Sequence, residues 1–153
     1  MTYHRKTDLI GRFSSHHAYV RAEDNSAVSY TPRQFWQFNS RPGDISITHE
    51  PSKPGAYSVR VPGLGGPGGR HVQVSAYGTG AERCKVGSWG QVGVGGSTRQ
   101  DEVIYVNCFK AGQPANSMFT LSYVGAESRD RGHWRTGAVP PRGPLAPGSR
   151  STR

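Results

Sequence analysis

Apolar and polar residues alternate along several short segments in the middle of the chain. Residues 56–61 read AYSVRV, residues 71–77 read HVQVSAY and residues 117–123 read SMFTLSY. In each segment the apolar side chains occupy every second position, which is the period of a strand with one buried and one exposed face. That division is typical of antiparallel sheets. No ten-residue segment has a convincing helical period.

Clusters of glycine and proline separate the extended segments. They break the chain at 41–43, 51–55, 62–69, 78–80, 90–96 and 112–114. Short strands at this spacing are typical of a sandwich or a barrel. We therefore predict an all-β fold, an antiparallel β-sandwich or barrel of about eight short strands, in one domain over residues 16–125. The strands are expected near residues 18–22, 33–39, 44–49, 56–61, 71–77, 84–89, 102–109 and 117–123.

The two ends of the chain differ from this domain in composition. Residues 126–153 are dominated by Gly, Pro, Arg and Ser, and we predict a disordered, basic tail there. Residues 1–15 are weakly patterned and are predicted to be a flexible N-terminal segment. The tail holds a Pro141-x-x-Pro144 motif that resembles a polyproline ligand, but a tail of this composition produces such matches by chance.

The net charge of +9 lies mainly in those ends. Residues 1–15 carry +2 and residues 126–153 carry +4, which leaves +3 for the 110 residues between them. A folded nucleic-acid binder usually carries its basic face on the domain itself, so a nucleic-acid partner is not expected. No apolar run approaches the length of a membrane span, and the N-terminus lacks the apolar core of a signal peptide.

Cys84 and Cys108 are the only cysteines. Each lies in a predicted strand, on the face expected to point toward the core, and the two strands are consecutive. A hairpin would bring the two thiols together, so a disulfide is the leading interpretation, with two buried thiols as the alternative. A disulfide implies an oxidising compartment. No CxxC spacing suggests a metal site.

Several short motifs are candidates for chemical sites. Residues 63–68 match GxGxxG, but a strand rather than a helix is expected to follow them, and Pro67 removes a backbone donor, so we interpret them as a flexible loop. No GxSxG motif marks a nucleophile. The acidic pairs at 24–25 and 101–102 could touch Ca²⁺ but lack the spacing of a calcium loop. The adjacent His16 and His17 point to opposite sides of an extended chain. We therefore expect no catalytic residue, no metal and no cofactor.

The aromatic residues are the most informative unassigned feature. By alternation, Trp89 falls on the face opposite Cys84. If that face meets solvent, Trp89, Tyr77 and Tyr105, with Trp36 as a further member, form an exposed platform for a sugar ring or a peptide. The alternative is a sheet buried on both faces, with these residues in the core.

The run from Ala18 to Val124 resembles an uncharacterised all-β domain of predicted secreted actinobacterial and myxobacterial proteins. The residues that carry the resemblance are Gly55-x-Tyr57-x-Val59, Pro62-Gly63-Leu64-Gly65, Val72-x-Val74-x-Ala76-Tyr77-Gly78, Cys84-Lys85-Val86-x-Ser88-Trp89, Val106-x-Cys108-Phe109 and Gly112-x-Pro114-x-x-Ser117-x-Phe119-Thr120. The resemblance implies the fold and export from the cell, and no reaction.

These observations favour a non-catalytic, secreted or cell-envelope binding module for a glycan or a protein. The alternatives are a structural protein that self-associates through strand edges and, last, a small β-fold enzyme. The expected location is extracellular or in the cell envelope, with the cytoplasm as the alternative because no signal peptide is visible. The oligomeric state stays open.

Overall fold

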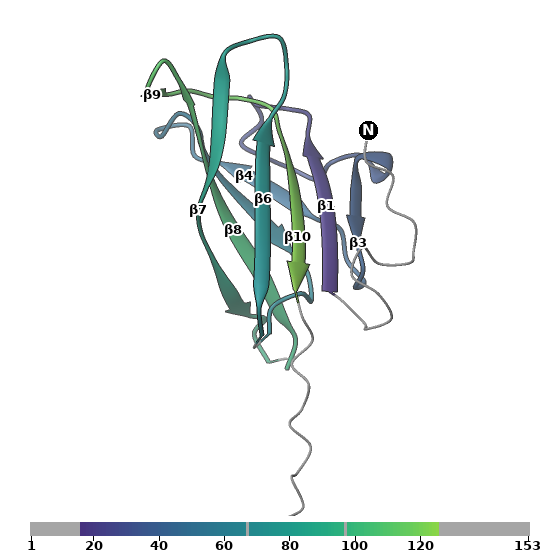
Figure 1. The fold of residues 1–153 in the computed structure, drawn as a ribbon. Coiled ribbons are helices and arrows are strands. Elements are labelled where there is room, and N and C mark those ends of the chain that lie inside the picture. Colours follow the sequence, from purple (N-terminus) through teal and green to yellow (C-terminus); the bar gives the residue numbers. More distant parts are fainter. Residues whose placement is uncertain (1–15, 67, 97, 126–153) are drawn as a thin grey trace, which may run out of the picture.

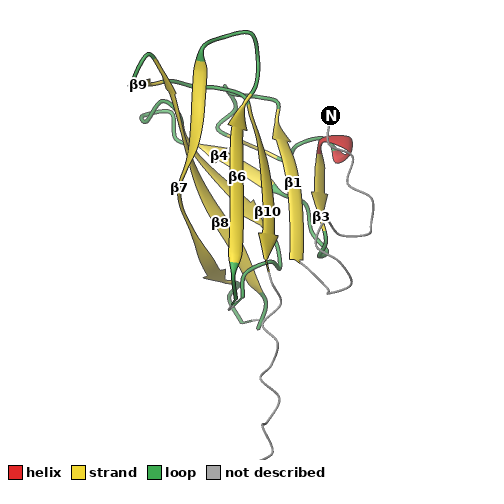
Figure 2. Ribbon diagram, viewed as in Figure 1, coloured by secondary structure: helices red, strands yellow, loops and turns green. Residues whose placement is uncertain are grey.

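A computed structural model describes residues 16–66, 68–96 and 98–125. It consists of short strands and one single-turn 3₁₀ helix, η1 (Figures 1 and 2). The elements are, in chain order, β1 (His16–Ala22), β2 (Ser29–Tyr30), η1 (Gln34–Trp36), β3 (Gln37–Asn39), β4 (Ser46–His49), β5 (Ala56–Val61), β6 (Arg70–Ala76), β7 (Glu82–Gly93), β8 (Gln100–Lys110), β9 (Gln113–Pro114) and β10 (Phe119–Gly125).

The strands form two antiparallel sheets. Sheet A has the order β3-β1-β10-β6, and sheet B has the order β2-β4-β5-β8-β7 with β9 added to the end of β8. Figure 1 shows sheet A in front of sheet B, with the strands of the two sheets inclined to each other. The prediction of an all-β sandwich or barrel is confirmed, and each of the eight predicted strands overlaps an observed one. The predictions for residues 1–15 and 126–153 lie outside the described residues.

The core lies between the sheets and follows the predicted alternation. From sheet A it takes Val20, Leu121 and Val74, which form one inward row across β1, β10 and β6. From sheet B it takes the inward residues of β5 and β8, among them Val59 and Ile104. Burial of these apolar side chains is the main favourable term for folding. No helix in the described part of the chain has the length and hydropathy needed to cross a bilayer.

Two predicted strands have different limits in the structure. Alternation predicts that residues 33–39 are extended throughout, but Gln34–Trp36 form η1, and only Gln37–Asn39 are a strand. The N–H of Trp36 donates to the carbonyl of Arg33 at 2.8 Å, and this local bond replaces a ladder bond. The strand predicted at 84–89 extends over Glu82–Gly93, so Gly90 does not end it as expected.

A β-bulge at Gly87 divides β7 into two halves. Val86 pairs with Val106 and Ser88 pairs with Tyr105, so Gly87 is the extra residue. An added Cβ at Gly87 would lie 2.5 Å from Nδ2 of Asn107. The bulge shifts the alternation by one position, so residues after Gly87 face the side opposite to the one that simple counting predicts.

The Cys84–Cys108 disulfide crosslinks β7 to β8 and confirms the leading interpretation of the two cysteines. The two residues are direct cross-strand partners, with their Cα atoms 4.0 Å apart. The N–H of Cys108 donates to Gly55 O, and its carbonyl accepts from Ala115, both on the side away from β7. The cysteines therefore form a non-hydrogen-bonded pair, the position at which facing Cα atoms lie closest.

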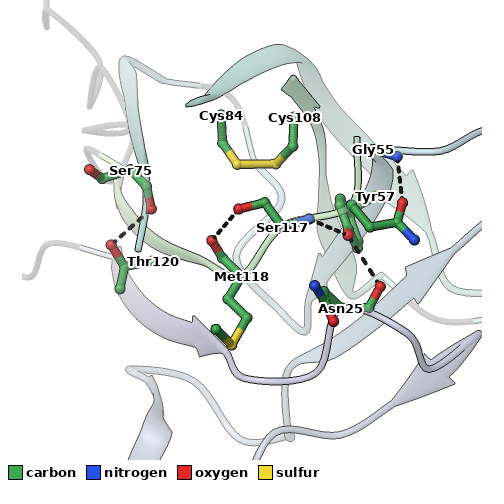
Figure 3. Close-up of a disulfide and its surroundings, with 10 residues drawn as sticks. Asn25, Gly55, Tyr57, Ser75, Cys84, Cys108, Ser117, Met118 and Thr120 are labelled. Carbon is green, nitrogen blue, oxygen red and sulfur yellow. Dashed lines mark hydrogen bonds between the residues drawn. A yellow bond between two sulfur atoms is a disulfide. The ribbon is translucent and has the colours of Figure 1, made fainter. Parts of the chain in front are cut away.

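Hydrogen bonds next to the disulfide fix the chain leading into β10. Figure 3 shows Ser117 below the disulfide, with its N–H donating to the hydroxyl of Tyr57 at 3.0 Å. Gly55 donates to Asn116 Oδ1 at 2.7 Å. Gly55 has φ +76, and an added Cβ would overlap the carbonyls of Cys108 and Ala115. Only glycine fits there, because its backbone lies against both residues.

The two ends of the described domain lie side by side. His16 at the start of β1 pairs with Gly125 at the end of β10. Figure 1 shows the start of β1 and the end of β10 at the end of the sandwich away from β9. The chain therefore enters and leaves the domain at the same place on sheet A.

Removing the disulfide should destabilise the domain substantially. We expect the C84A/C108A variant to lose about 3 kcal/mol of unfolding free energy, since the bond closes a loop between residues 24 apart in sequence. Urea denaturation followed by circular dichroism measures the loss. Wild-type protein with a reductant is the matched control, because it keeps both sulfur atoms. A loss below about 1 kcal/mol in both samples would contradict the prediction.

Candidate functional site

The outer face of sheet A presents ordered rows of side chains across all four strands. One row runs Phe38, Tyr19, Ser122 and Gln73, from β3 through β1 and β10 to β6. Because cross-strand partners point to the same side, these four side chains share the face opposite to the core. The row combines two aromatic rings with a hydroxyl and an amide.

Beside that row, Arg21 is stacked between two aromatic rings. Its guanidinium carbon lies 4.0 Å from the centroid of Trp36 and 4.4 Å from that of Tyr77. Tyr77 is held in turn, because its hydroxyl donates to the carbonyl of Ala22 at 3.0 Å. A cation between two ring faces is stabilised by both quadrupoles, so this stack fixes the position of two rings from different ends of the sheet.

Further aromatic side chains extend the patch toward solvent. Phe35 is 67% exposed and its ring lies 4.9 Å from that of Trp36. Phe38 is 42% exposed and stacks on the imidazole of His17 at 5.0 Å. We call the set Phe35, Trp36, Arg21, Tyr77, Phe38, His17 and Tyr19 the aromatic patch. Exposed apolar rings gathered at one place make this patch the candidate contact surface of the domain.

Polar side chains continue from the aromatic patch onto β10 and β6. Arg21 pairs with Thr120, which pairs with Ser75, and Tyr19 pairs with Ser122, which pairs with Gln73. Hydroxyl and amide groups donate and accept hydrogen bonds without carrying charge. The face therefore offers flat apolar surface at one side and hydrogen-bonding groups at the other.

The four residues predicted as one platform do not share a surface. Trp36 and Tyr77 come together around Arg21, as part of the aromatic patch. Tyr105 is 51% exposed on the outer face of sheet B. Trp89 pairs with Ile104, a core residue, so it points to the inward side of sheet B, the side of Cys84. The prediction that Trp89 lies opposite Cys84 is wrong because the bulge at Gly87 shifts the alternation.

Sequence reasoning missed the central member of the patch. Arg21 stands in the segment AYVRA, where alternation puts Tyr19 and Arg21 on the polar face. That signal could have suggested an outward pair, but no local pattern says that η1 and the end of β6 bring Trp36 and Tyr77 to either side of Arg21. The stack depends on strand order, which alternation does not contain.

Residues 63–65 of the GxGxxG segment, between β5 and β6, make hydrogen bonds to β8 and β10. Gly63 donates its N–H to Asp101 Oδ1 at 2.8 Å, and Gly65 donates to the carbonyl of Gln100 at 3.0 Å. The hydroxyl of Tyr123 donates to the carbonyl of Leu64 at 3.1 Å. The N–H groups of both glycines therefore already donate to acceptors within the chain. Hydrogen bonds fix residues 63–65, in a loop that was expected to be flexible.

The acidic pairs considered for Ca²⁺ are engaged with neighbouring groups. Asp24 accepts from the backbone and hydroxyl of Ser26 and from the N–H of Ala27, which lower its pKa. Asp101 and Glu102 are adjacent in a strand, so they point to opposite faces of sheet B. They therefore do not form one acidic site.

Asp101 lies beneath arginine side chains on the outer side. Burial acts to raise its pKa, but the Gly63 N–H, Arg60 at 2.8 Å and Arg99 at 3.3 Å outweigh burial and lower it. Asp101 is therefore a charged anchor that ties the 62–69 loop to β8. This carboxylate is saturated by donors from the chain.

Glu102 is fully buried on the inward side, against Arg70. The Nη1 of Arg70 lies 3.4 Å from Oε1, and Oε2 has no hydrogen-bond partner among the residues that the structure describes. Burial raises the pKa of Glu102, and the charge of Arg70 offsets only part of that rise. Arg70 also donates to the carbonyl of Gly66 and to Gln91 Oε1, so the guanidinium bridges β6, β7 and β8.

The imidazoles of His17, His16 and His49 make separate contacts. His17 stacks on Phe38, and the imidazole of His16 contacts Arg41. His49 is buried with its ring 5.1 Å from that of Tyr57. Within residues 16–66, 68–96 and 98–125, no group of three or more His, Cys, Asp or Glu side chains is placed to hold a metal ion.

Comparison with protein-family models gives no match, and comparisons with curated proteins and with solved structures give no significant match.

The raised pKa of Glu102 predicts a measurable pH dependence of stability. The native state binds this proton more tightly than the unfolded chain, whose carboxyl has a pKa near 4.5. The stabilising contribution of protonated Glu102 to the unfolding free energy is therefore fully present below the unfolded-chain pKa. It is lost as pH rises through the higher pKa of the native state. Because the side chain of E102Q is neutral at every pH, the unfolding free energy of E102Q minus that of wild type should increase from about pH 4 to about pH 7.

The matched control is E82Q. A hydrogen bond from Lys110 lowers the pKa of Glu82, so the corresponding difference for E82Q should fall over the same pH range. Urea denaturation at a series of pH values measures both differences. A constant or falling difference for E102Q would contradict the assignment.

Proposed function

We propose that this protein is a non-catalytic binding module that recognises a glycan with the outer face of sheet A. The observation that carries the proposal is the stack of Trp36, Arg21 and Tyr77 beside the row of Phe38, Tyr19, Ser122 and Gln73. Together they form one surface built from β1, β3, β6 and β10.

The chemistry of this surface suits a sugar. A pyranose ring has an apolar C–H face, which packs on an aromatic ring, and a rim of hydroxyls, which need hydrogen-bond partners. The aromatic patch supplies the first requirement. Ser122, Gln73, Thr120 and Ser75 supply the second from the neighbouring strands.

The surface is largely preorganised. The Arg21 cation holds Trp36 and Tyr77 from both sides, and Tyr77 is further fixed by its bond to Ala22. Rings that are already ordered lose little conformational entropy on binding, so more of the contact free energy appears as affinity. Neutral hydroxyl and amide groups along β10 and β6 favour recognition over proton transfer.

Export from the cell is part of the proposal. The Cys84–Cys108 disulfide supports it, because such bonds persist in oxidising compartments. The resemblance of residues 18–124 to a domain of predicted secreted proteins points the same way. A module outside the cell or in its envelope would have surface polysaccharides within reach.

Loss of one ring from the patch should weaken glycan binding strongly. Wild type is tested against immobilised peptidoglycan, chitin, cellulose and a panel of acidic and neutral oligosaccharides, and the best binder is titrated by calorimetry. We expect W36A and F38A each to weaken that binding by about tenfold, the equivalent of about 1.4 kcal/mol for a lost stacking contact.

Tyr105→Ala is the matched control, since Tyr105 is an exposed aromatic residue on the opposite sheet. It should leave the affinity unchanged. The proposal fails if Y105A weakens binding as much as W36A does. It also fails if wild type binds none of the glycans, in which case a protein ligand for the same patch is the next hypothesis.

A further inference from the structure

The second half of β7 is a free strand edge. Within the described ranges β7 pairs only with β8. Cys108 turns its N–H and carbonyl away from β7, and by alternation so do Ile104 and Glu102. Their partners Trp89 and Gln91, followed by Gly93, therefore direct their backbone groups away from β8. All three residues are exposed.

The other edge strands are very short or begin with basic residues, whereas β7 is long: charged residues and the bulge at Gly87 protect its first half, and its second half has no such feature. β2 and β9 have two residues each and β3 has three, and very short strands offer little to pair with. β6 begins with Arg70 and His71. β7 has twelve residues, and no residue from 86 to 94 is charged or is proline. Proteins usually block such an edge with charges or proline, so an unblocked one suggests a partner strand.

Two glycines in this segment are not required by the described part of the chain. Gly87 is required by Asn107, but an added Cβ at Gly90 or at Gly93 would meet nothing within 4 Å. Neither residue has a positive φ. Glycine inside a strand costs stability and often marks the close approach of another chain. Two exposed apolar side chains stand beside them, Trp89 at 45% and Val92 at 44% exposure.

The glycines and the large side chains are complementary to each other when two copies of β7 run antiparallel about Gln91. In that register Trp89 faces Gly93 of the other copy, and Val92 faces Gly90 of the other copy. The faces agree, because Trp89 and Gly93 both lie on the inward side, and Val92 and Gly90 both lie on the outward side. A large side chain over a cross-strand glycine fills the space that the missing side chain leaves.

The backbone groups agree with the same register. Trp89, Gln91 and Gly93 all point to the free edge, so the pairs 89–93, 91–91 and 93–89 each exchange two hydrogen bonds. Residues 86–94 carry no charge, so no like charges of the two β7 strands face each other; the nearby Arg70, which donates to Gln91, is paired with Glu102 of its own chain.

We propose that this protein self-associates through β7, which pairs antiparallel with β7 of a second copy about Gln91 and joins the two B sheets into one. The contact is a single strand edge. Interfaces below about 1,200 Å² are weak or transient, so the fraction of dimer should rise with protein concentration. The outer face of sheet A takes no part in it.

A crosslinking experiment tests the register. In an antiparallel hydrogen-bonded pair the Cα atoms lie about 5.5 Å apart, within the range that a disulfide spans. Q91C should therefore form a covalent dimer under mild oxidation, with the new bond mapped by mass spectrometry between position 91 of one copy and position 91 of the other. V92C is the matched control. In this register position 92 of one copy faces Gly90 of the other copy, so the two cysteines of a V92C dimer are offset by two residues. V92C should therefore crosslink at least about tenfold more slowly.

A second variant separates association from folding. The Cβ of Gly93→Val would meet no atom of the described residues within 4 Å, and valine favours an extended backbone, so the melting temperature of G93V should equal or exceed that of wild type. In the dimer, however, it collides with Trp89. Sedimentation velocity over about a hundredfold concentration range should show a shift toward dimer for wild type and none for G93V. Three results would overturn the proposal: wild type that stays monomeric, G93V that associates like wild type, or equal crosslinking of Q91C and V92C.

Discussion

The bond between Cys84 and Cys108 fixes the pairing of β7 with β8 in sheet B. β8 lies between β5 and β7, and its inward residues form the buried centre of the sheet. Among the described residues β7 has a ladder with β8 alone, so without the crosslink its pairing in the sheet would rest on one ladder interrupted by a bulge. The disulfide lies in the half of β7 before the bulge and leaves the second half held by hydrogen bonds and by Arg70. The strand thus has a fixed start and an exposed, uncharged end.

Arginines are used in two different ways between and around these sheets. Arg70 enters the interior and pairs with a carboxylate that has no other donor among the described residues, which is a costly arrangement because one oxygen stays unsatisfied. Arg21 stays at the surface, where ring faces cover its charge from both sides. The first arginine connects three strands of the interior, and the second organises the surface that we propose for ligand binding.

Alternation along the chain predicted the class of fold, the eight longer strands and the inward faces of residues such as Tyr57, Val72 and Leu121. It also placed both cysteines toward the core on consecutive strands. These features follow from the period of a strand and from local turn residues, which are written in the sequence. Glycine and proline clusters placed most of the breaks correctly.

The ligand platform could not be predicted in the same way. One extra residue at Gly87 moved Trp89 to the inward side, and η1 replaced the first half of an expected strand. The grouping of Trp36 with Tyr77 depends on β1 lying between β3 and β10, and on residues more than forty positions apart in sequence. Strand order and bulges are set by packing between distant segments, so the periodic pattern of the sequence does not predict them.

The pairing of His16 with Gly125 has a mechanical consequence. A pulling force applied through the two ends would act across the β1–β10 ladder from its terminal pair, in the direction of its hydrogen bonds. The pairs would then open one at a time, as in a zipper, rather than shear together. The disulfide offers no protection there, because it joins two strands of the other sheet. If several copies were joined through these ends, a pulling force would unfold each of them at low force, starting with the sheet that carries the aromatic patch.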